Sequence, residues 1–192
     1  MMTNPAWAFE IDNTQDWAFV EKLLTPEECK SIINSNEIID TAKIIKNNQS
    51  INDSSIRDSS IKFLSPTNDN KWLYQRITDC VTEANSVCFN FDLFGLTESL
   101  QLTKYDAPKG HYDYHLDKCV NSTIRKLSFS ILLNDDYDGG DFEILIEKES
   151  TKLPKSQGTM LIFPSYILHR VTPVIKGSRY SIVGWITGKP FK

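Results

Sequence analysis

The sequence predicts an α+β fold, in which a helical layer packs against a β-sandwich or barrel. Two observations point to this class: helical patterns dominate the first half of the chain, and from about residue 98 short alternating segments are separated by turns. The chain has 192 residues, 40% of them hydrophobic. A domain of this length buries roughly 70% of its unfolded surface, so a full core is available. We therefore expect a single domain over residues 1–192, with support elements over 1–97 and a β core over 98–189.

Two helices are predicted in the first half. The first begins at Pro26 and runs to about Asn36, because Thr25 can cap it, Pro26 suits the first helical position and Glu28 completes a capping box. The second spans residues 69–87, where apolar residues recur with a period near 3.6. Its predicted core-facing residues are Trp72, Leu73, Ile77, Cys80, Val81, Ala84 and Val87.

The β half follows as seven segments of alternating polarity. They are ESLQLTKY, HYDYHLD, RKLSFSILLN, DFEILIE, GTMLIF, LHRVTPV and SRYSIVGWIT. Turn-forming Asn, Asp and Gly residues separate several of them, as in an all-β sandwich or barrel. Earlier in the chain, residues 46–60 are polar and rich in Asn and Ser, which predicts a loop. This loop is either a solvated connector or a flap over a site.

Composition excludes several classes of protein. The formal net charge is -4, which argues against a nucleic-acid partner that would need a basic stripe. No apolar run approaches the roughly 20 residues of a membrane span, and the first residues lack the features of a signal peptide, so we expect a soluble, cytoplasmic chain without a membrane partner. The four cysteines form no CxxC pair, which predicts reduced thiols rather than a zinc ribbon. They are Cys29, Cys80, Cys88 and Cys119.

The three histidines all lie in the β half and suggest a metal site. Residues two apart in a strand face the same side, so His115 and Asp117 can point together into a cavity. With His169 they form two imidazoles and one carboxylate, the facial triad of non-haem Fe(II) oxygenases. Alternation alone does not choose between this pair and the pair of His111 and Asp113. Taken alone, such a pair also fits a histidine that caps a loop or satisfies a buried polar group.

An arginine ten residues after His169 strengthens the metal interpretation. Residues 173–177 can form a turn that returns the chain as a neighbouring strand, which brings Arg179 back near His169. A guanidinium suits bidentate capture of a carboxylate. Ser181, Val183 and Trp185 share its face of the strand. An ordinary surface arginine is the alternative.

These motifs, in this order, resemble those of Fe(II)- and 2-oxoglutarate-dependent dioxygenases of the prolyl 4-hydroxylase-like group. LLTPEEC is similar to the opening helix, LQLTKYDAPKGHYDYHLD to the stretch that ends in the HxD metal motif, and LLNDDYDGGDFEI to a Gly-Gly hairpin. GTMLIFPSYILHRVTPVIKGSRYSIVGWITG is the most similar stretch. The resemblance implies a double-stranded β-helix, or jelly roll, with the N-terminal helices packed on one sheet.

The resemblance also implies roles for individual residues. The group's Gly and two Tyr match Gly110, Tyr105 and Tyr112 when counted back from His115, which favours His115, Asp117 and His169 as the metal ligands and catalytic centre. His111 and Asp113 then lie on the rim or the substrate side. The cosubstrate residues are Arg179 and Tyr105 at the far carboxylate, with Ser128 and Ser181 in the same pocket. Substrate contacts are Tyr112, Arg125 and Trp185. Two departures are Leu132, where the group often has Tyr, and Arg179, where several members have Lys.

The resemblance implies hydroxylation of an unactivated C–H bond with release of succinate and CO2. The expected cofactors are Fe(II), 2-oxoglutarate and O2, with ascorbate as a further cofactor, and the expected substrate is a prolyl residue in a peptide or protein. Three alternatives remain: a catalytically silent jelly-roll binding or sensing domain, a hydroxylase of a free amino acid or small metabolite, and a zinc hydrolase with the same three ligands. The hydrolase lacks an obvious general base and leaves Arg179 unexplained.

Overall fold

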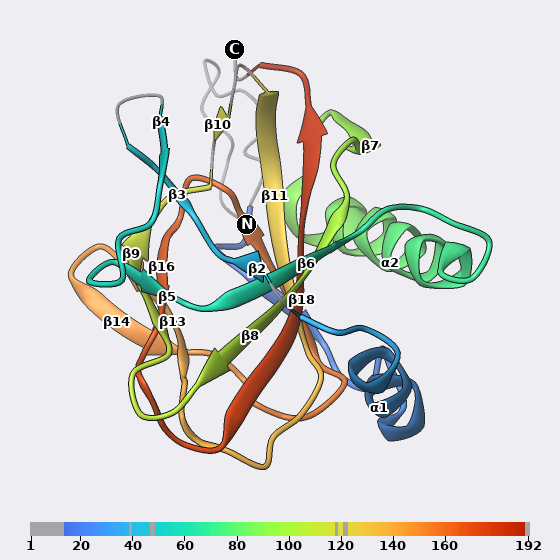
Figure 1. The fold of residues 1–192 in the computed structure, drawn as a ribbon. Helices are drawn as coiled ribbons and strands as arrows, with labels where there is room; N and C mark the ends of the chain where they lie inside the picture. Colours follow the sequence, from blue (N-terminus) through green and yellow to red (C-terminus); the bar gives the residue numbers. More distant parts are fainter. Residues whose placement is uncertain (1–13, 39, 47–48, 118, 121–122, 191–192) are drawn as a thin grey trace, which may run out of the picture.

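The protein is a β-sandwich with two helices on the outer side of its larger sheet (Figure 1). The computed structural model describes residues 14–38, 40–46, 49–117, 119–120 and 123–190. This arrangement confirms the predicted α+β class and the packing of the helices on one sheet. The division of the chain at residue 98 stays a prediction. In the described part of the chain, no helix is long and apolar enough to cross a membrane.

The larger sheet has nine strands in the described part of the chain. Its main path runs through β1 (Ala18–Val20), β15 (Met160–Pro164), β11 (Thr123–Leu132), β18 (Ser178–Gly188), β8 (Leu100–Asp106), β6 (Ser60–Leu64) and β2 (Asp40–Thr41). Two further strands lie off this path: β10 (Cys119–Val120) pairs with β11, and β7 (Leu93–Leu96) pairs with β18. The pairs between these strands are antiparallel. The two longest strands, β11 and β18, lie next to each other in the middle of the sheet.

The smaller sheet faces the larger one across the interior. Its strand order is β14 (Glu149–Lys152), β13 (Phe142–Ile146), β16 (Leu168–Val171), β9 (His111–His115) and β5 (Arg57–Asp58). Two separate strand pairs complete the described fold: β3 (Ile44–Lys46) with β4 (Gln49–Ile51), and β12 (Asp138–Gly139) with β17 (Val174–Lys176). Each of the seven predicted segments contains a strand of one of the two sheets.

The first helix, α1 (Pro26–Asn34), begins where its capping residues predict. The Glu28 amide donates to Thr25 Oγ1 at 3.2 Å, and the Thr25 amide donates to Glu28 Oε2 at 2.9 Å. These reciprocal bonds satisfy two of the amides that the first turn of a helix leaves without partners. The helix ends two residues before the predicted Asn36.

The second helix corrects part of the predicted apolar stripe. It consists of α2 (Lys71–Ala84) followed by a π-helical turn, η1 (Asn85–Phe89). Trp72 and Val87 are 39% and 75% exposed rather than buried. The Arg76 guanidinium carbon lies over the Trp72 ring, 4.9 Å from the ring centroid. The wider π turn changes the 3.6-residue period, so that Phe89 is buried and Val87 is not.

The prediction of a loop over residues 46–60 is also wrong in part. Strand β4 and strand β5 lie inside this segment, and β6 begins at its end; residues 47–48 are outside the described residues. Strand β5 pairs with β9, and β6 pairs with β8. These partners are about 40 residues or more away in the sequence, so pairing overrides a composition that favours loops. The segment therefore brings residues to the edge of the site described below.

The larger sheet separates two interiors. On its outer face, Ile131, Ile182 and Ile186 join Leu73 and Ile77 of α2 in one apolar cluster. On its inner face, the alternate residues of the same strands face the smaller sheet. Side chains of a strand alternate between the two faces of its sheet. Alternate residues of β18 therefore pack in the core beneath the helices and line the wall of a cavity.

Candidate metal and cosubstrate site

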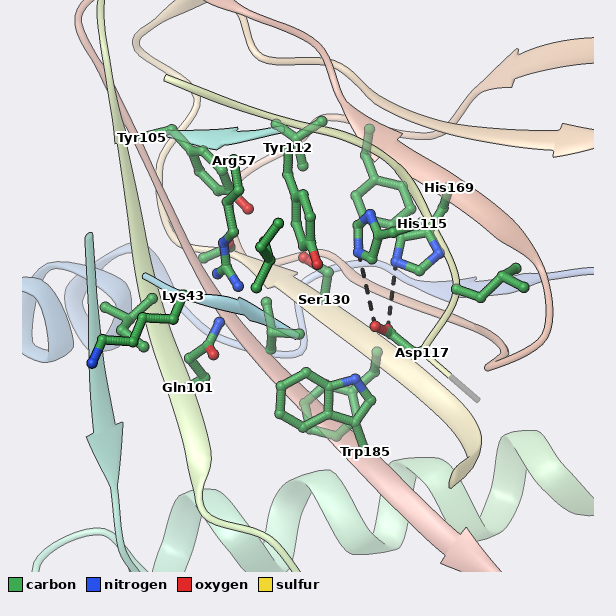
Figure 2. A pocket seen from close by; sticks show the side chains of 18 of the residues that line it. Lys43, Arg57, Gln101, Tyr105, Tyr112, His115, Asp117, Ser130, His169 and Trp185 are labelled. Atoms are coloured by element: carbon green, nitrogen blue, oxygen red, sulfur yellow. Dashed lines mark ion pairs between the residues drawn. The ribbon is translucent and has the colours of Figure 1, made fainter. Parts of the chain in front are cut away.

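A cavity of about 920 Å³ lies between the two sheets and takes its walls from both. The larger sheet contributes residues of β8, β11, β15 and β18, and the smaller sheet contributes residues of β5, β9, β13 and β16. Figure 2 shows that these side chains converge on one space. The polar and charged ones that matter below are Arg57, Tyr105, Tyr112, His115, Asp117, Arg125, Ser130, His169, Arg179, Ser181 and Trp185.

Two imidazoles and one carboxylate meet at one end of this cavity. His115 ends β9 and is paired in register with His169 of β16, while Asp117 follows two residues after β9. Asp117 Oδ1 lies 3.8 Å from His115 Nε2, and its Oδ2 lies 3.4 Å from His169 Nε2 (Figure 2). The three candidate ligand atoms all lie within 4.8 Å of one another. Two histidines and one carboxylate on one side form the donor set of non-haem iron oxygenases.

Backbone carbonyls fix the tautomers of both imidazoles. His115 Nδ1 lies 2.8 Å from the Asp113 carbonyl oxygen, and His169 Nδ1 lies 2.9 Å from the Ile167 carbonyl oxygen. A carbonyl oxygen accepts only, so each Nδ1 carries the proton. In a neutral ring, the Nε2 lone pair is then free and points toward Asp117, as a metal-ligating histidine requires.

The electrostatics of this end favour metal-binding protonation states. Burial lowers the pKa of His115 to about 3, reinforced by the neighbouring His169. Burial opposes ionisation of Asp117, but the two imidazoles outweigh it and hold the pKa of this carboxyl well below its usual range. At neutral pH the site therefore presents a neutral His115 and an anionic Asp117, and little proton release is needed when a cation binds.

Two serines hold the Asp117 carboxylate from behind. Ser128 Oγ donates to Asp117 Oδ2 at 2.9 Å and lies 2.9 Å from Ser165 Oγ, while the Asp117 amide donates to the Ser165 carbonyl at 3.0 Å. Ser128 is fully buried and is not among the described residues that line the cavity. It therefore contacts the candidate metal ligand rather than the open space. Its role toward the cosubstrate stays a prediction.

Ser130 is the serine that faces the cavity, and the sequence analysis missed it. It lies two residues after Ser128 on β11, so both point to the inner face. Its hydroxyl is buried and has no hydrogen-bond partner among the described residues. Strand register places Ser130 opposite Val183, between the pair of Ser128 with Trp185 and the pair of Leu132 with Ser181. Alternation from Ser128 was the signal that could have found it.

The alternative pair, His111 and Asp113, lies elsewhere. His111 Nδ1 is 2.7 Å from the Lys109 carbonyl oxygen, and its Nε2 is 3.3 Å from the Ser55 carbonyl oxygen. Asp113 is exposed and accepts the Tyr114 amide at 2.8 Å. Neither residue is among the described residues that line the cavity or form the metal cluster. His111 instead ties the 46–60 segment to β9.

Arg179 lies on the inner face of β18, farther along the cavity wall. It is 1% exposed, and strand register pairs it with Tyr105, whose ring centroid lies 5.4 Å from the guanidinium carbon. Its Nη1 donates to Ser181 Oγ at 2.9 Å. Its Nε and Nη2 have no acceptor among the described residues, and no described carboxylate lies within 4 Å. A buried guanidinium without a counter-charge is costly, so this end of the cavity favours an anion.

The three predicted substrate-side residues all line the cavity. Tyr112 stacks on the His115 imidazole with ring centroids 3.5 Å apart, and burial raises its pKa to about 12. Trp185 lies beneath Arg125, whose guanidinium carbon is 3.7 Å from the ring and whose Nε donates to Glu98 at 2.7 Å. Arg125 is therefore a paired charge that holds the indole in place.

Arg57 is a further cavity residue that the sequence analysis missed. It comes from β5, inside the segment predicted as a loop, and its guanidinium carbon lies 4.6 Å from the ring centroid of Tyr112 (Figure 2). The segment's composition gave no sign of β5, so no sequence signal placed this residue.

Comparison with known proteins agrees with this geometry. Residues 100–187 match the 2OG-Fe(II) oxygenase superfamily. A PKHD-type hydroxylase of Synechococcus sp. (strain CC9311) is 47% identical over 81 residues, which cover 41% of this chain and 37% of that protein. A PKHD-type hydroxylase of Prochlorococcus marinus (strain MIT 9515) is 29% identical over 175 residues, which cover 86% of this chain and 75% of that protein. The first matches thus span less than half the length of the curated relatives.

Solved structures show the same fold. A Pseudomonas putida prolyl-4-hydroxylase superposes with a TM-score of 0.70 at 18% identity, over 92% of this chain and 95% of that one. A Trichoplax adhaerens prolyl hydroxylase, in complex with a hypoxia inducible factor peptide fragment, superposes with a TM-score of 0.73 at 17% identity, over 90% and 84% of the two chains. Residues 100–187 are thus similar to the 2OG-Fe(II) oxygenases, and the chain has the double-stranded β-helix fold of the prolyl 4-hydroxylases.

The similarity to this superfamily implies Fe(II), 2-oxoglutarate and O2, and the residues present fit these groups. His115, Asp117 and His169 are the donor types that Fe(II) takes, and as only three ligands they leave coordination positions open. Arg179 carries two buried N–H groups without acceptors, which suits a carboxylate. Both features lie on one cavity, as a dicarboxylate that reaches from the metal to the arginine requires.

Proposed function

We propose that the protein is an Fe(II)- and 2-oxoglutarate-dependent dioxygenase that hydroxylates an unactivated C–H bond, with release of succinate and CO2. One observation carries the proposal: a single cavity contains both the His115–Asp117–His169 cluster and the uncompensated buried Arg179. A metal site alone fits hydrolases as well, and a buried arginine alone fits many anion sites. The combination fits a metal enzyme with an anionic cosubstrate.

In this proposal, His115, Asp117 and His169 hold the metal. Bound Fe(II) supplies the oxidation, in which one oxygen atom of O2 enters the substrate C–H bond and the other enters succinate. Arg179 and Tyr105 bind the far carboxylate of 2-oxoglutarate, and Ser181 orients the guanidinium through its bond to Nη1. Ser128 fixes the Asp117 carboxylate, so the metal ligands keep one geometry.

The substrate we propose is a prolyl residue in a peptide or protein. Support comes from the curated relatives, which are named hydroxylases, and from the Trichoplax neighbour, which is a prolyl hydroxylase bound to a peptide fragment. The cavity wall also includes two aromatic side chains, Tyr112 and Trp185, and Tyr112 lies directly beside the candidate metal ligand His115.

The proposal is tested by succinate production from 2-oxoglutarate and O2 by the Fe(II)-reconstituted protein, with and without a panel of proline-containing peptides. We expect peptide-stimulated turnover, a mass gain of one oxygen on the peptide, and inhibition by Zn(II). The Asp117→Ala variant is the matched negative control.

Two outcomes would change the conclusion in different ways. Turnover that no peptide stimulates, but that a free amino acid or small metabolite does, would replace the prolyl substrate and keep the oxygenase. No succinate from a protein that demonstrably binds iron and 2-oxoglutarate would favour a binding or sensing domain.

A further inference from the structure

The strand that carries His115 has one residue more than its neighbour just before the metal cluster. From Tyr112 to His115, β9 advances three residues, whereas the facing stretch of β16 advances only two. The extra residue makes a β-bulge, in which two residues of β9 oppose the single residue Arg170 of β16. Bulges re-aim side chains and are common next to active sites. The direction of His115 therefore depends on this irregularity.

The bulge lets two cavity residues share one face of β9. In a regular strand, residues three apart point to opposite faces of the sheet. Tyr112 and His115 are three apart, yet both line the cavity, and their rings stack with centroids 3.5 Å apart. Without the extra residue, a strand that kept Tyr112 in the cavity would turn His115 out of it. Contacts that stabilise the bulge therefore affect the position of a candidate metal ligand.

A ring of polar contacts holds the bulge from the face of the smaller sheet that is turned away from the cavity. The Arg170 guanidinium carbon lies 4.6 Å from the Tyr114 ring centroid, and Arg170 Nε donates to Glu143 Oε2 at 2.8 Å. The Ser150 hydroxyl donates to the same Glu143 oxygen at 2.9 Å and accepts the Tyr114 hydroxyl at 2.9 Å, which closes the ring. These four side chains come from β9, β16, β13 and β14, so the ring joins four neighbouring strands where β9 bulges.

Glu143 fixes Arg170 in this position. Its carboxylate is on a residue only 6% exposed, and a buried charge keeps its partner because separation would leave it uncompensated. Arg170 Nη2 lies 2.7 Å from Glu143 Oε2, so two guanidinium nitrogens contact one carboxylate oxygen. Strand register also places the two residues directly opposite each other. The guanidinium therefore presents a fixed flat face on which the Tyr114 ring packs.

We infer that Tyr114 and Arg170 are positioning residues, whose contact holds the β9 bulge and thereby directs His115 into the metal cluster. Tyr114 precedes His115 and Arg170 follows His169 in the sequence, but neither is among the described residues that line the cavity. They act through the backbone of β9 rather than through contact with substrate or cosubstrate. The inference goes beyond the proposed function but rests on it for the identity of His115 as a metal ligand.

The test is the dissociation constant and the visible absorption spectrum of Co(II) bound to the metal-free protein, without O2 or 2-oxoglutarate. Tyr114→Ala removes the ring that Arg170 contacts. Loss of an interaction that orients a metal ligand typically costs about 10–100-fold in metal affinity, so we expect at least about tenfold weaker Co(II) binding and a changed spectrum. Tyr114→Phe keeps the ring and loses only the bond to Ser150, so it should restore the wild-type affinity and spectrum.

Lys152→Met is the matched control. Lys152 pairs with Asp141 at 2.7 Å on the same sheet, and its strand β14 is separated from β9 by β13 and β16. The substitution breaks an ion pair without touching the bulge, so Co(II) affinity and spectrum should be unchanged. Melting temperatures establish that each variant is folded. If Tyr114→Ala does not fold, Tyr114→Leu, which also lacks the flat ring, takes its place with the same expected result.

The outcomes separate the inference from the proposed function. Wild-type Co(II) affinity and spectrum in Tyr114→Ala would overturn the inference, and so would equal weakening in Tyr114→Phe or in Lys152→Met. Each of these results leaves the proposed function intact. Wild-type protein that binds neither Co(II) nor Fe(II) would overturn both.

Discussion

Strand β18 presents opposite chemistry on its two faces. Ile182 and Ile186 point to the outer face, where they are buried in the apolar cluster beneath the helices. Arg179, Ser181 and Trp185 point to the inner face and line the cavity. The outer face is closed by apolar contacts. The inner face keeps the buried Nε and Nη2 donors of Arg179, which have no acceptor among the described residues.

The difference between the two faces shows how one strand can contribute to stability and to function separately. Apolar burial on the outer face stabilises the fold in proportion to the area removed from water. Buried donors without partners on the inner face destabilise the ligand-free protein and are satisfied when an anion binds. Substitutions on the inner face should therefore change binding and activity more than folding, and substitutions on the outer face should do the reverse. Substitutions on the two faces test this contrast.

The largest effect is expected at the metal cluster. Asp117→Ala removes the carboxylate between His115 and His169, so iron binding and succinate production should fall by at least about a thousandfold, the scale of losing an essential catalytic group. Urea denaturation of the metal-free variant checks that it is folded, since the deletion also removes the hydrogen bond from Ser128 to Asp117.

The matched control for this variant is Asp113→Ala. Asp113 lies four residues earlier, within β9, but it is exposed and outside the cavity, so its removal should leave iron binding unchanged. Full activity in Asp117→Ala, or loss of iron in Asp113→Ala, would show that the wrong carboxylate has been assigned to the metal.

The next prediction compares the loss of stability at two adjacent residues of β18, one on each face of the sheet. Ile182→Ala leaves a hole in the helix-covered core and should lower the free energy of unfolding by about 2–5 kcal/mol. Val183→Ala, on the cavity wall and only partly buried, should cost less than about 1.5 kcal/mol. Urea denaturation of both variants measures the difference. Equal losses of unfolding free energy at the two positions would contradict the conclusion that the outer face contributes more to stability than the inner face.

How much of this contrast the sequence predicts depends on the element. Alternation placed Arg179, Ser181 and Trp185 on one face of a strand, and the structure puts all three on the cavity wall. The cap at Thr25 is likewise local chemistry, and the helix begins where it predicts. Features that a few neighbouring residues determine were thus available from the sequence.

Features that depend on partners far away in the sequence could not be predicted from it. Strand β5 lies in a polar segment that reads as a loop, and only its pairing with β9 makes it a strand and brings Arg57 to the cavity. Val87 fits the apolar period of its helix but is exposed, because a π turn interrupts that period. The sequence also does not show which buried hydroxyls are left without partners in the folded protein, so Ser130 is found only in the structure.

A smaller effect is expected at Gly184, where the outer face of the larger sheet leaves no room for a Cβ atom. A Cβ atom added there would lie 2.4 Å from Phe129 Cζ and 3.1 Å from Leu100 Cδ2. Gly184→Ala should therefore destabilise the protein by about 1–3 kcal/mol through overpacking. In urea denaturation, Phe129→Leu should reduce the cost of Gly184→Ala, since it removes the ring atoms that clash. Additive losses in the double variant would show that the strain lies elsewhere.

The cap of α1 tests a site remote from the cavity. Thr25→Ala removes the acceptor of the Glu28 amide and should lower the free energy of unfolding by about 1 kcal/mol. Thr25→Ser keeps a hydroxyl and should retain most of the stability. Affinity for 2-oxoglutarate should be unchanged in both, because α1 contributes no described residue to the cavity wall. A change in that affinity would mean that the helix layer and the cavity are coupled.

The smallest effect, and the one with a defined pH dependence, is expected at Glu28. Its hydrogen bond with Arg76, at 2.6 Å, is the main cause that holds the pKa of this carboxyl below its usual value. The unfolded chain therefore binds a proton more readily than the folded one, and the stabilisation is present above the unfolded pKa and lost as the pH falls through the folded pKa. Glu28→Gln should cost less than about 1 kcal/mol at neutral pH, and the difference from wild type should shrink in acid. Urea denaturation at neutral and at acidic pH measures this difference in the free energy of unfolding. A difference that grows in acid would rule out the ion pair as its source.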